Sequence, residues 1–170
     1  MDRRHFILAA LGAGAGTLVV ARGAHAQQGA TKAPAAGALP PMTVYKSASC
    51  GCCTAWVDHA RKSGFTVRTV DTEDLASVKR EMGIPAKLQS SHTVMVGTYV
   101  VEGHVPADDV KKLLATKPRV RGLAVPGMPL GSPGMEQGPP AGYDRYEVIA
   151  FTASGATSVF ATHGPPKGTG

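Results

Sequence analysis

Apolar and polar residues along the middle of the chain follow two different periods, and each change of period marks a predicted element. Alternation over residues 42–46 and again over residues 65–70 predicts two β-strands. Between them, apolar residues recur every three or four positions, which predicts an amphipathic helix with a buried stripe. We expect this helix to begin near Cys52 or Cys53 and to end at Gly64, which suits a left-handed cap.

The same pattern predicts four further elements before the chain becomes rich in glycine and proline. They are a helix from a cap at Asp71 or Thr72 to about Met82, strands over residues 93–96 and 99–102 joined by the turn Gly97-Thr98, and a helix opened by Pro106 and ending near Lys117. Both helices have acidic residues near their start, and the second has lysines toward its end, as the helix dipole favours. The order β-α-β-α-β-β-α predicts an α/β fold of the thioredoxin-like type.

The C-terminal third of the chain has fewer periodic segments. A long Gly/Pro/Met loop is expected over residues 118–142, followed by a β-hairpin with strands over residues 146–152 and 157–161. We therefore predict a single thioredoxin-like, metal-binding domain with a C-terminal extension over residues 42–161, and a flexible tail over residues 162–170.

The N-terminal residues have the features of an export signal. Arg3 and Arg4 precede a Gly/Ala-rich apolar stretch that is too short and too broken by glycine for a lasting transmembrane helix. The paired arginines resemble a twin-arginine signal, and an ordinary secretory signal that starts with two arginines is the alternative. We expect residues 1–26 to be removed near Ala26 and residues 27–41 to form a disordered linker. The mature protein would then be periplasmic, without a stable membrane anchor.

Charge excludes one class of partner. The formal net charge is +6, but the 18 Lys and Arg residues are spread along the chain without a long basic run. We therefore expect no nucleic-acid partner.

All three cysteines of the chain lie in the segment Cys50-Gly51-Cys52-Cys53, directly after the first predicted strand. No cysteine is left elsewhere for a disulfide between distant segments. The free N–H groups at a helix N-terminus favour thiolates, which serve both disulfide exchange and soft-metal binding. The third sulfur favours a metal, because thiolates can bridge Cu(I) ions and an extra thiol would scramble a redox pair. A thiol–disulfide oxidoreductase acting through Cys50 and Cys53 is the alternative function. A third possibility is a purely structural Cys50–Cys53 disulfide beside an unreactive Cys52.

Methionines and histidines supply further candidate ligands. Met128 and Met135 lie on the loop rich in glycine and proline, which has few core-forming residues, so packing does not explain their presence. Thioethers bind Cu(I) and are poor zinc ligands, so copper is favoured over zinc. Otherwise these methionines only cover an apolar surface. His92 lies in the loop before the third strand, where thioredoxin-like oxidoreductases usually place a cis-proline. His104 is either a ligand or the cap of the third helix.

Two residues near these candidates are expected to have other roles. His59, on the outer part of the first helix, is expected to be solvated. Trp56, one turn after Cys53, is expected to belong to the core.

Taken together, these motifs resemble a bacterial family of exported metal-binding proteins, long described as a domain of unknown function, that includes the copper-resistance protein CopG. The resemblance covers roughly residues 42–160. Its carriers are Cys50-Gly51-Cys52-Cys53 with Trp56 and Val57, Ser91-His92-Thr93, the segment from Glu102 to Pro106, and the segment from Gly122 to Glu136.

The resemblance implies a thioredoxin-like fold and a thiolate-bridged site for more than one copper ion. It also implies a role in periplasmic copper tolerance, other periplasmic copper-handling proteins as partners, and an oxidoreductase activity that interconverts Cu(I) and Cu(II). The ligands that it implies are first Cys50, Cys52 and Cys53, then His92 and Met135, and then His104 and Met128. The chain departs from many relatives at Ser91, where they have a cysteine, and so has one thiolate fewer.

Overall fold

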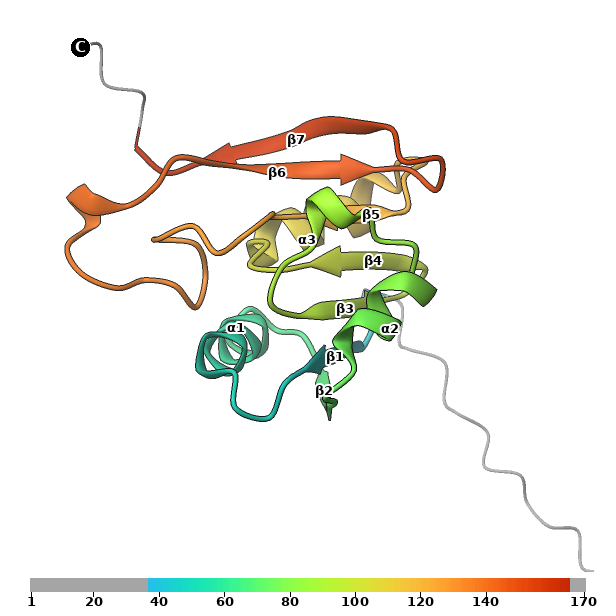
Figure 1. The fold of residues 1–170 in the computed structure, drawn as a ribbon. Helices are drawn as coiled ribbons and strands as arrows, with labels where there is room; N and C mark the ends of the chain where they lie inside the picture. Colours follow the sequence, from blue (N-terminus) through green and yellow to red (C-terminus); the bar gives the residue numbers. More distant parts are fainter. Residues whose placement is uncertain (1–36, 166–170) are drawn as a thin grey trace, which may run out of the picture. The chain divides into compact units, whose positions relative to one another are not determined.

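The structure is a computed structural model that describes residues 37–165 (Figure 1). The predicted signal peptide, residues 27–36 of the predicted linker and residues 166–170 of the predicted tail lie outside the described residues. Residues 37–41, at the end of the predicted linker, are described, and Leu39 packs against the core.

Helices and strands alternate along most of the described chain. The elements are β1 (Met42–Lys46), α1 (Gly51–Lys62), β2 (Val67–Asp71), α2 (Leu75–Glu81), β3 (Thr93–Val96), β4 (Tyr99–Glu102), α3 (Ala107–Thr116), β5 (Gly122–Ala124), β6 (Tyr146–Phe151) and β7 (Thr157–His163), with short 3-10 turns η1 (Ala86–Leu88) and η2 (Pro140–Gly142). The order from β1 to α3 is the predicted one, and the α/β class is confirmed. None of the helices in the described part of the chain combines the length and apolarity needed to cross a bilayer.

All seven strands of the described residues form one sheet in the order β2-β1-β3-β4-β5-β6-β7. The β1–β2 and β4–β5 pairs are parallel and the other four pairs are antiparallel. Figure 1 shows the β6–β7 hairpin at one edge of the sheet and β2 at the other. Because β1 is central among the first four strands, the turn that follows it brings the cysteine segment next to the loop before β3.

Side chains alternate between the two faces of the sheet, and each face has its own apolar cluster. On one face, Trp56 and Val57 of α1 and Leu113 of α3 pack against the larger cluster. On the other face, Ile84 and Leu88, which follow α2, pack against Phe151 and its neighbours. Trp56 is fully buried in the larger cluster, as predicted.

The first boundary difference is in β2, which was predicted over residues 65–70 and begins at Val67. Phe65 is buried in the core, and its N–H donates to the carbonyl of Ala60 at 3.1 Å. This hydrogen bond closes the end of α1, so Phe65 does not take part in the sheet.

The second difference is in α2, which starts later than predicted. Its cap is Asp74, whose carboxylate accepts the Ser77 N–H at 2.9 Å, whereas Asp71 is the last residue of β2. Thr72 instead accepts the N–H of Asp74, so neither predicted cap is used.

The predicted loop over residues 118–142 contains a strand that the sequence pattern did not predict. The three residues of β5 are buried and pair with both β4 and β6. Gly122 allows this approach, because a Cβ there would collide with the backbone of Val100. The C-terminal hairpin was predicted, and β7 extends to His163, two residues into the predicted tail.

Candidate metal centre

The turn after β1 places the cysteines at the start of α1. Cys50 is the N-cap residue: its backbone is extended, and its Sγ accepts the N–H of Cys53 at 3.3 Å. A cysteine therefore occupies the position that Ser, Thr, Asp or Asn usually takes. The helix begins at Gly51, so all three sulfur atoms belong to its cap and first turn.

The three Sγ atoms lie within 4.8 Å of one another, and those of Cys50 and Cys52 are 3.5 Å apart. Cys53 is fully buried, whereas Cys50 and Cys52 are half-buried. Among the described residues, these cysteines are the one group of three or more His, Cys, Asp or Glu side chains close enough to hold a metal ion.

Cys50 and Cys53 are joined by a disulfide, with Cα atoms 5.3 Å apart, and Cys52 is a free thiol. This pairing is one of the alternatives that the sequence left open. It does not separate a redox site from a metal site, because reduction of the same bond supplies thiolates for either.

The two candidate histidines lie beside the buried side of the cysteine cluster. The carbonyl of Ser91 is 3.8 Å from Sγ of Cys53, and the ring of Trp56 lies 4.8 Å from that of His92. The rings of His92 and His104 meet edge to face at 5.0 Å. The site therefore combines α1, the loop before β3 and the residues after β4, although neither histidine joins the close group of sulfur atoms.

Ser91 links the two histidines through its hydroxyl group. Its Oγ is 3.1 Å from Nδ1 of His92 and 3.0 Å from Nε2 of His104. Nδ1 of His104 donates to the carbonyl of Pro133 at 2.8 Å. Nε2 of His92 is buried and has no hydrogen-bond partner among the described residues.

Burial favours the neutral form of both imidazole rings. Burial, and to a smaller extent the nearby His104 and Lys79, lowers the pKa of His92 well below its ordinary value. Burial also lowers the pKa of His104, against the opposing effects of the hydrogen bond to Pro133 and the charge of Glu136. A neutral ring keeps one nitrogen lone pair available to accept a proton or a metal.

The long loop after β5 returns to the start of α1. A Cβ added at Gly134 would lie 2.7 Å from the carbonyl oxygen of Cys52 and 2.8 Å from the backbone nitrogen of Trp56. Met135 follows directly and is half-buried, so its backbone is held beside the cysteine turn. Met128 is 52% exposed and is not part of this contact.

Replacement of Gly134 by alanine is expected to destabilise the fold by about 1–3 kcal/mol more than replacement of Gly127, because it overpacks the contact with α1. Both glycines have a positive φ, +85° and +71°, so both alanines carry similar backbone strain. A Cβ at Gly127 has no atom within 4 Å. Urea unfolding of the two variants beside the wild type measures the difference, and equal losses would contradict the packing of the loop on α1.

The expectation that His59 is solvated is wrong. His59 is half-buried, and its Nε2 accepts the N–H of Ala107 at 3.1 Å. It therefore caps α3, whose N-cap residue Pro106 offers no side-chain acceptor. His104 does not cap α3. No local signal in the sequence points to this contact, because the two residues are far apart in the chain.

A buried ion pair fixes the loop that leads to His92, and the sequence interpretation missed it. Nζ of Lys79 is 2.6 Å from Oε1 of Glu102, and both side chains are buried. Thr93 donates to Oε2 of Glu102 at 2.6 Å, and the N–H of Ser90 donates to Oε1 at 2.6 Å. Burial raises the pKa of Glu102, and Lys79 opposes this effect. The signal in the sequence was an acidic residue that ends an otherwise apolar strand.

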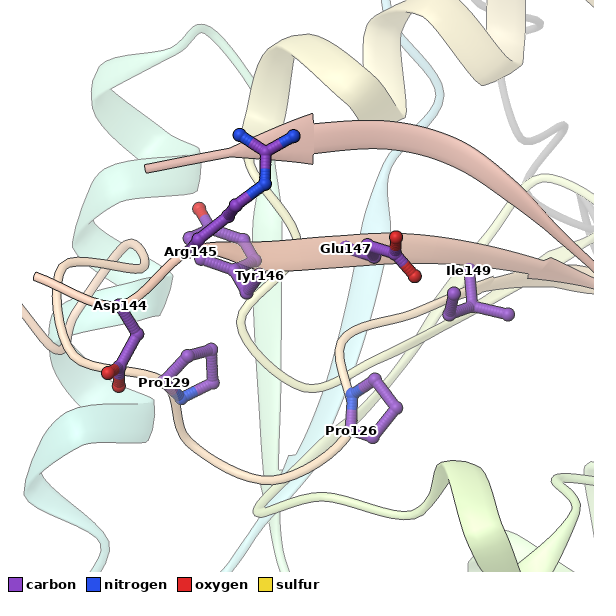
Figure 2. Close-up of a pocket in the computed structure, with 7 residues that line it drawn as sticks. All are labelled: Pro126, Pro129, Asp144, Arg145, Tyr146, Glu147 and Ile149. Atoms are coloured by element: carbon purple, nitrogen blue, oxygen red, sulfur yellow. The ribbon is translucent and has the colours of Figure 1, made fainter. Parts of the chain in front are cut away.

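A separate groove of about 580 Å³ lies near the start of β6. Figure 2 shows its lining residues, which are Pro126, Pro129, Asp144, Arg145, Tyr146, Glu147 and Ile149. Asp144 accepts the N–H of Leu130 at 2.8 Å, so this carboxylate holds the long loop in place. None of the cysteines, histidines or methionines proposed as ligands lines the groove.

Comparison with known proteins gives two kinds of match. Residues 88–135 match the family described as "Protein of unknown function, DUF411". Two solved structures are similar to this chain, forms 1 and 2 of copper resistance protein CopG. The match with form 1 covers 75% of this chain and 99% of the CopG chain, and the match with form 2 covers 74% and 98%. Their sequence identities are 41% and 42%, with TM-scores of 0.70 and 0.69. No protein with a curated description matches the chain.

Proposed function

Because the chain belongs to the family of the copper resistance protein CopG, we propose that it is a periplasmic copper-binding protein of a copper-resistance system. The observation that carries this proposal is the set of three cysteine sulfur atoms within 4.8 Å of one another. Thiolates are soft ligands that bind Cu(I) and zinc, so the sulfur cluster supports a soft metal ion. The predicted export signal supports the periplasmic location, where other copper-handling proteins would deliver or accept the metal.

The residues around the sulfur atoms fit a copper ion. His92 follows Ser91, whose carbonyl oxygen is 3.8 Å from Sγ of Cys53, and its unpartnered Nε2 is a further candidate donor. Met135 is the thioether whose backbone lies beside the cysteine turn. We assign weaker roles to His104, both of whose ring nitrogens have hydrogen-bond partners, and to the exposed Met128. Zinc fits this set less well, because thioethers are poor zinc ligands.

The proposal extends to redox chemistry at the same sulfur atoms. Bound copper can change between Cu(I) and Cu(II), which exchanges one electron per ion. Closure of the Cys50–Cys53 bond releases two electrons, and its reduction takes up two. The cysteine pair can therefore balance the conversion of two Cu(II) ions to Cu(I). At the start of the helix the N–H of Cys53 donates to Sγ of Cys50, and burial of Cys53 limits access of water.

Counting bound copper tests the proposal. The purified protein, reduced under anaerobic conditions and loaded with Cu(I), is expected to retain more than one ion per chain against a competing chelator. The Cys52→Ser/Cys53→Ser variant should lose tight binding, because it keeps one thiolate. Ser49→Ala, in the same exposed turn, should bind like the wild type. Absence of tight binding in the wild type, or equal binding in the cysteine variant, would refute the proposal.

The second candidate function is thiol–disulfide exchange through Cys50 and Cys53, in which the disulfide of the structure would be the bond that is reduced and reformed. It predicts reduction of insulin without any metal, activity that Cys50→Ser abolishes and Met135→Leu leaves unchanged. The copper proposal predicts no such activity, because the loop beside the disulfide, which contains Ser91 and His92, has no proline there.

A further inference from the structure

We propose that Ser91 fixes the tautomer of His92, so that Nδ1 carries the proton and the buried Nε2 is a free lone pair. The proposal deepens the proposed function, because it makes Ser91 the residue that keeps His92 ready to bind copper. It assigns Ser91 a positioning role that acts through His92.

The direction of each hydrogen bond follows from the hydrogen bond between His104 and the carbonyl of Pro133. The carbonyl of Pro133 can only accept, so Nδ1 of His104 carries a proton. In a neutral ring, Nε2 of His104 is then a lone pair and must accept from Ser91. The single hydroxyl proton of Ser91 is thereby used. Oγ of Ser91 can only accept from His92, so Nδ1 of His92 must be the donor.

If the hydrogen bond between Ser91 and His92 ran in the opposite direction, two groups would lack hydrogen-bond partners. If Ser91 donated to Nδ1 of His92, its oxygen would face the lone pair of His104 with no hydrogen between them. The proton of His92 would then sit on Nε2, which is buried without an acceptor among the described residues. An unpaired buried donor is costly, so the structure selects the first direction.

Packing prevents the ring of His92 from flipping, which would exchange the positions of its two nitrogens. The rings of Trp56 and His104 lie 4.8 and 5.0 Å from it, and its side chain is fully buried. Trp56 is itself fixed, because its Nε1 donates to the carbonyl of Val105 at 2.9 Å. A closely packed ring keeps its orientation, so the identity of the protonated nitrogen depends on Ser91.

Ser91 also touches the cysteine cluster. Its carbonyl oxygen lies 3.8 Å from Sγ of Cys53, while its hydroxyl group contacts both histidines. One residue therefore connects the buried sulfur to the ring whose lone pair is free. Hydrogen bonds of this kind to the second nitrogen of a histidine orient the ring and tune its affinity for a metal.

Nitrogen NMR of the metal-free, reduced protein tests the tautomer. Long-range correlations of ¹⁵N-histidine protein should show His92 as the Nδ1–H form in the wild type. In Ser91→Ala, a substantial fraction should change to the Nε2–H form, which free imidazole favours in water. Ser91→Thr keeps the hydroxyl group and should restore the Nδ1–H form. An Nε2–H signal in the wild type, or no change in Ser91→Ala, would overturn the proposal.

Copper affinity tests the consequence for the site. Competition with a Cu(I) chelator should show about tenfold weaker binding or more in Ser91→Ala, as for other residues that support a metal ligand, and affinity close to the wild type in Ser91→Thr. Unchanged affinity in Ser91→Ala would overturn the link to copper. If the wild type shows the expected tautomer but binds no copper, the tautomer assignment is supported and the proposed function fails.

Discussion

Oxidised protein, with the Cys50–Cys53 disulfide intact, is expected to bind Cu(I) more than about 100-fold less tightly than reduced protein. Loss of an outer hydrogen bond to a metal ligand already costs about 10–100-fold in affinity, and the disulfide removes two direct thiolate ligands. The remaining thiol, Cys52, cannot hold the ion alone. The measurement is competition with a chromophoric Cu(I) chelator before and after treatment with a reductant, under anaerobic conditions.

Cys50→Ser provides the matched control for this prediction. The variant cannot form the Cys50–Cys53 bond, so its weaker affinity should depend little on treatment with an oxidant. A count of free thiols after denaturation confirms the state of each sample, because the oxidised wild type has one free thiol and the reduced protein has three. Equal affinities of oxidised and reduced wild type would show that the disulfide and the copper site are separate.

Lys79→Met is expected to lower the free energy of unfolding by about 3–5 kcal/mol, because it leaves the carboxylate of Glu102 buried without its cation. Lys111→Met is the matched control. Lys111 is partly exposed and pairs with the exposed Asp108, so its loss should cost less than about 1 kcal/mol. Chemical denaturation of the two variants and the wild type measures both effects, and similar losses would contradict the role of the buried pair.

The stability of the Lys79→Met variant should change with pH in a definite direction. Burial raises the pKa of Glu102 above its ordinary value of 4.5, and loss of the ammonium group should raise it further. The folded state of the variant then binds a proton more tightly than the unfolded state. Its stability is therefore greatest at low pH and decreases as the pH rises above about 4.5. A loss of stability relative to the wild type that is constant over this range would show that Lys79 does not influence the pKa of Glu102.

The parts of the fold that could be predicted are those with strong local patterns. β1, β3 and β4 have the predicted bounds, because β1 alternates apolar and polar residues and the mostly apolar β3 and β4 flank a two-residue turn. β5 escaped prediction because three residues cannot show a period and its first residue is a glycine. Asp74 was missed as a cap because two polar residues just before it offered the same chemistry.

One part of the candidate site could likewise be predicted from the sequence, and another part could not. The three cysteines lie in one helical turn, so sequence adjacency was enough to predict that they meet. The contact between His92 and His104 depends on the pairing of β3 with β4, which places Gly103 against the carbonyl of His92 at 2.9 Å. The bridge through Ser91 depends on the direction of a side chain, and no residue pattern encodes it.

The return of the long loop to α1 has a consequence for the order in which the site is completed. During synthesis, the cysteines emerge long before Pro133 and Gly134, which hold His104 and cover the first turn of α1. A growing chain therefore carries three uncovered thiols until nearly all of the domain has been made. Export of an already folded protein would deliver the covered site. Export of an unfolded chain would expose the thiols to the oxidising compartment first.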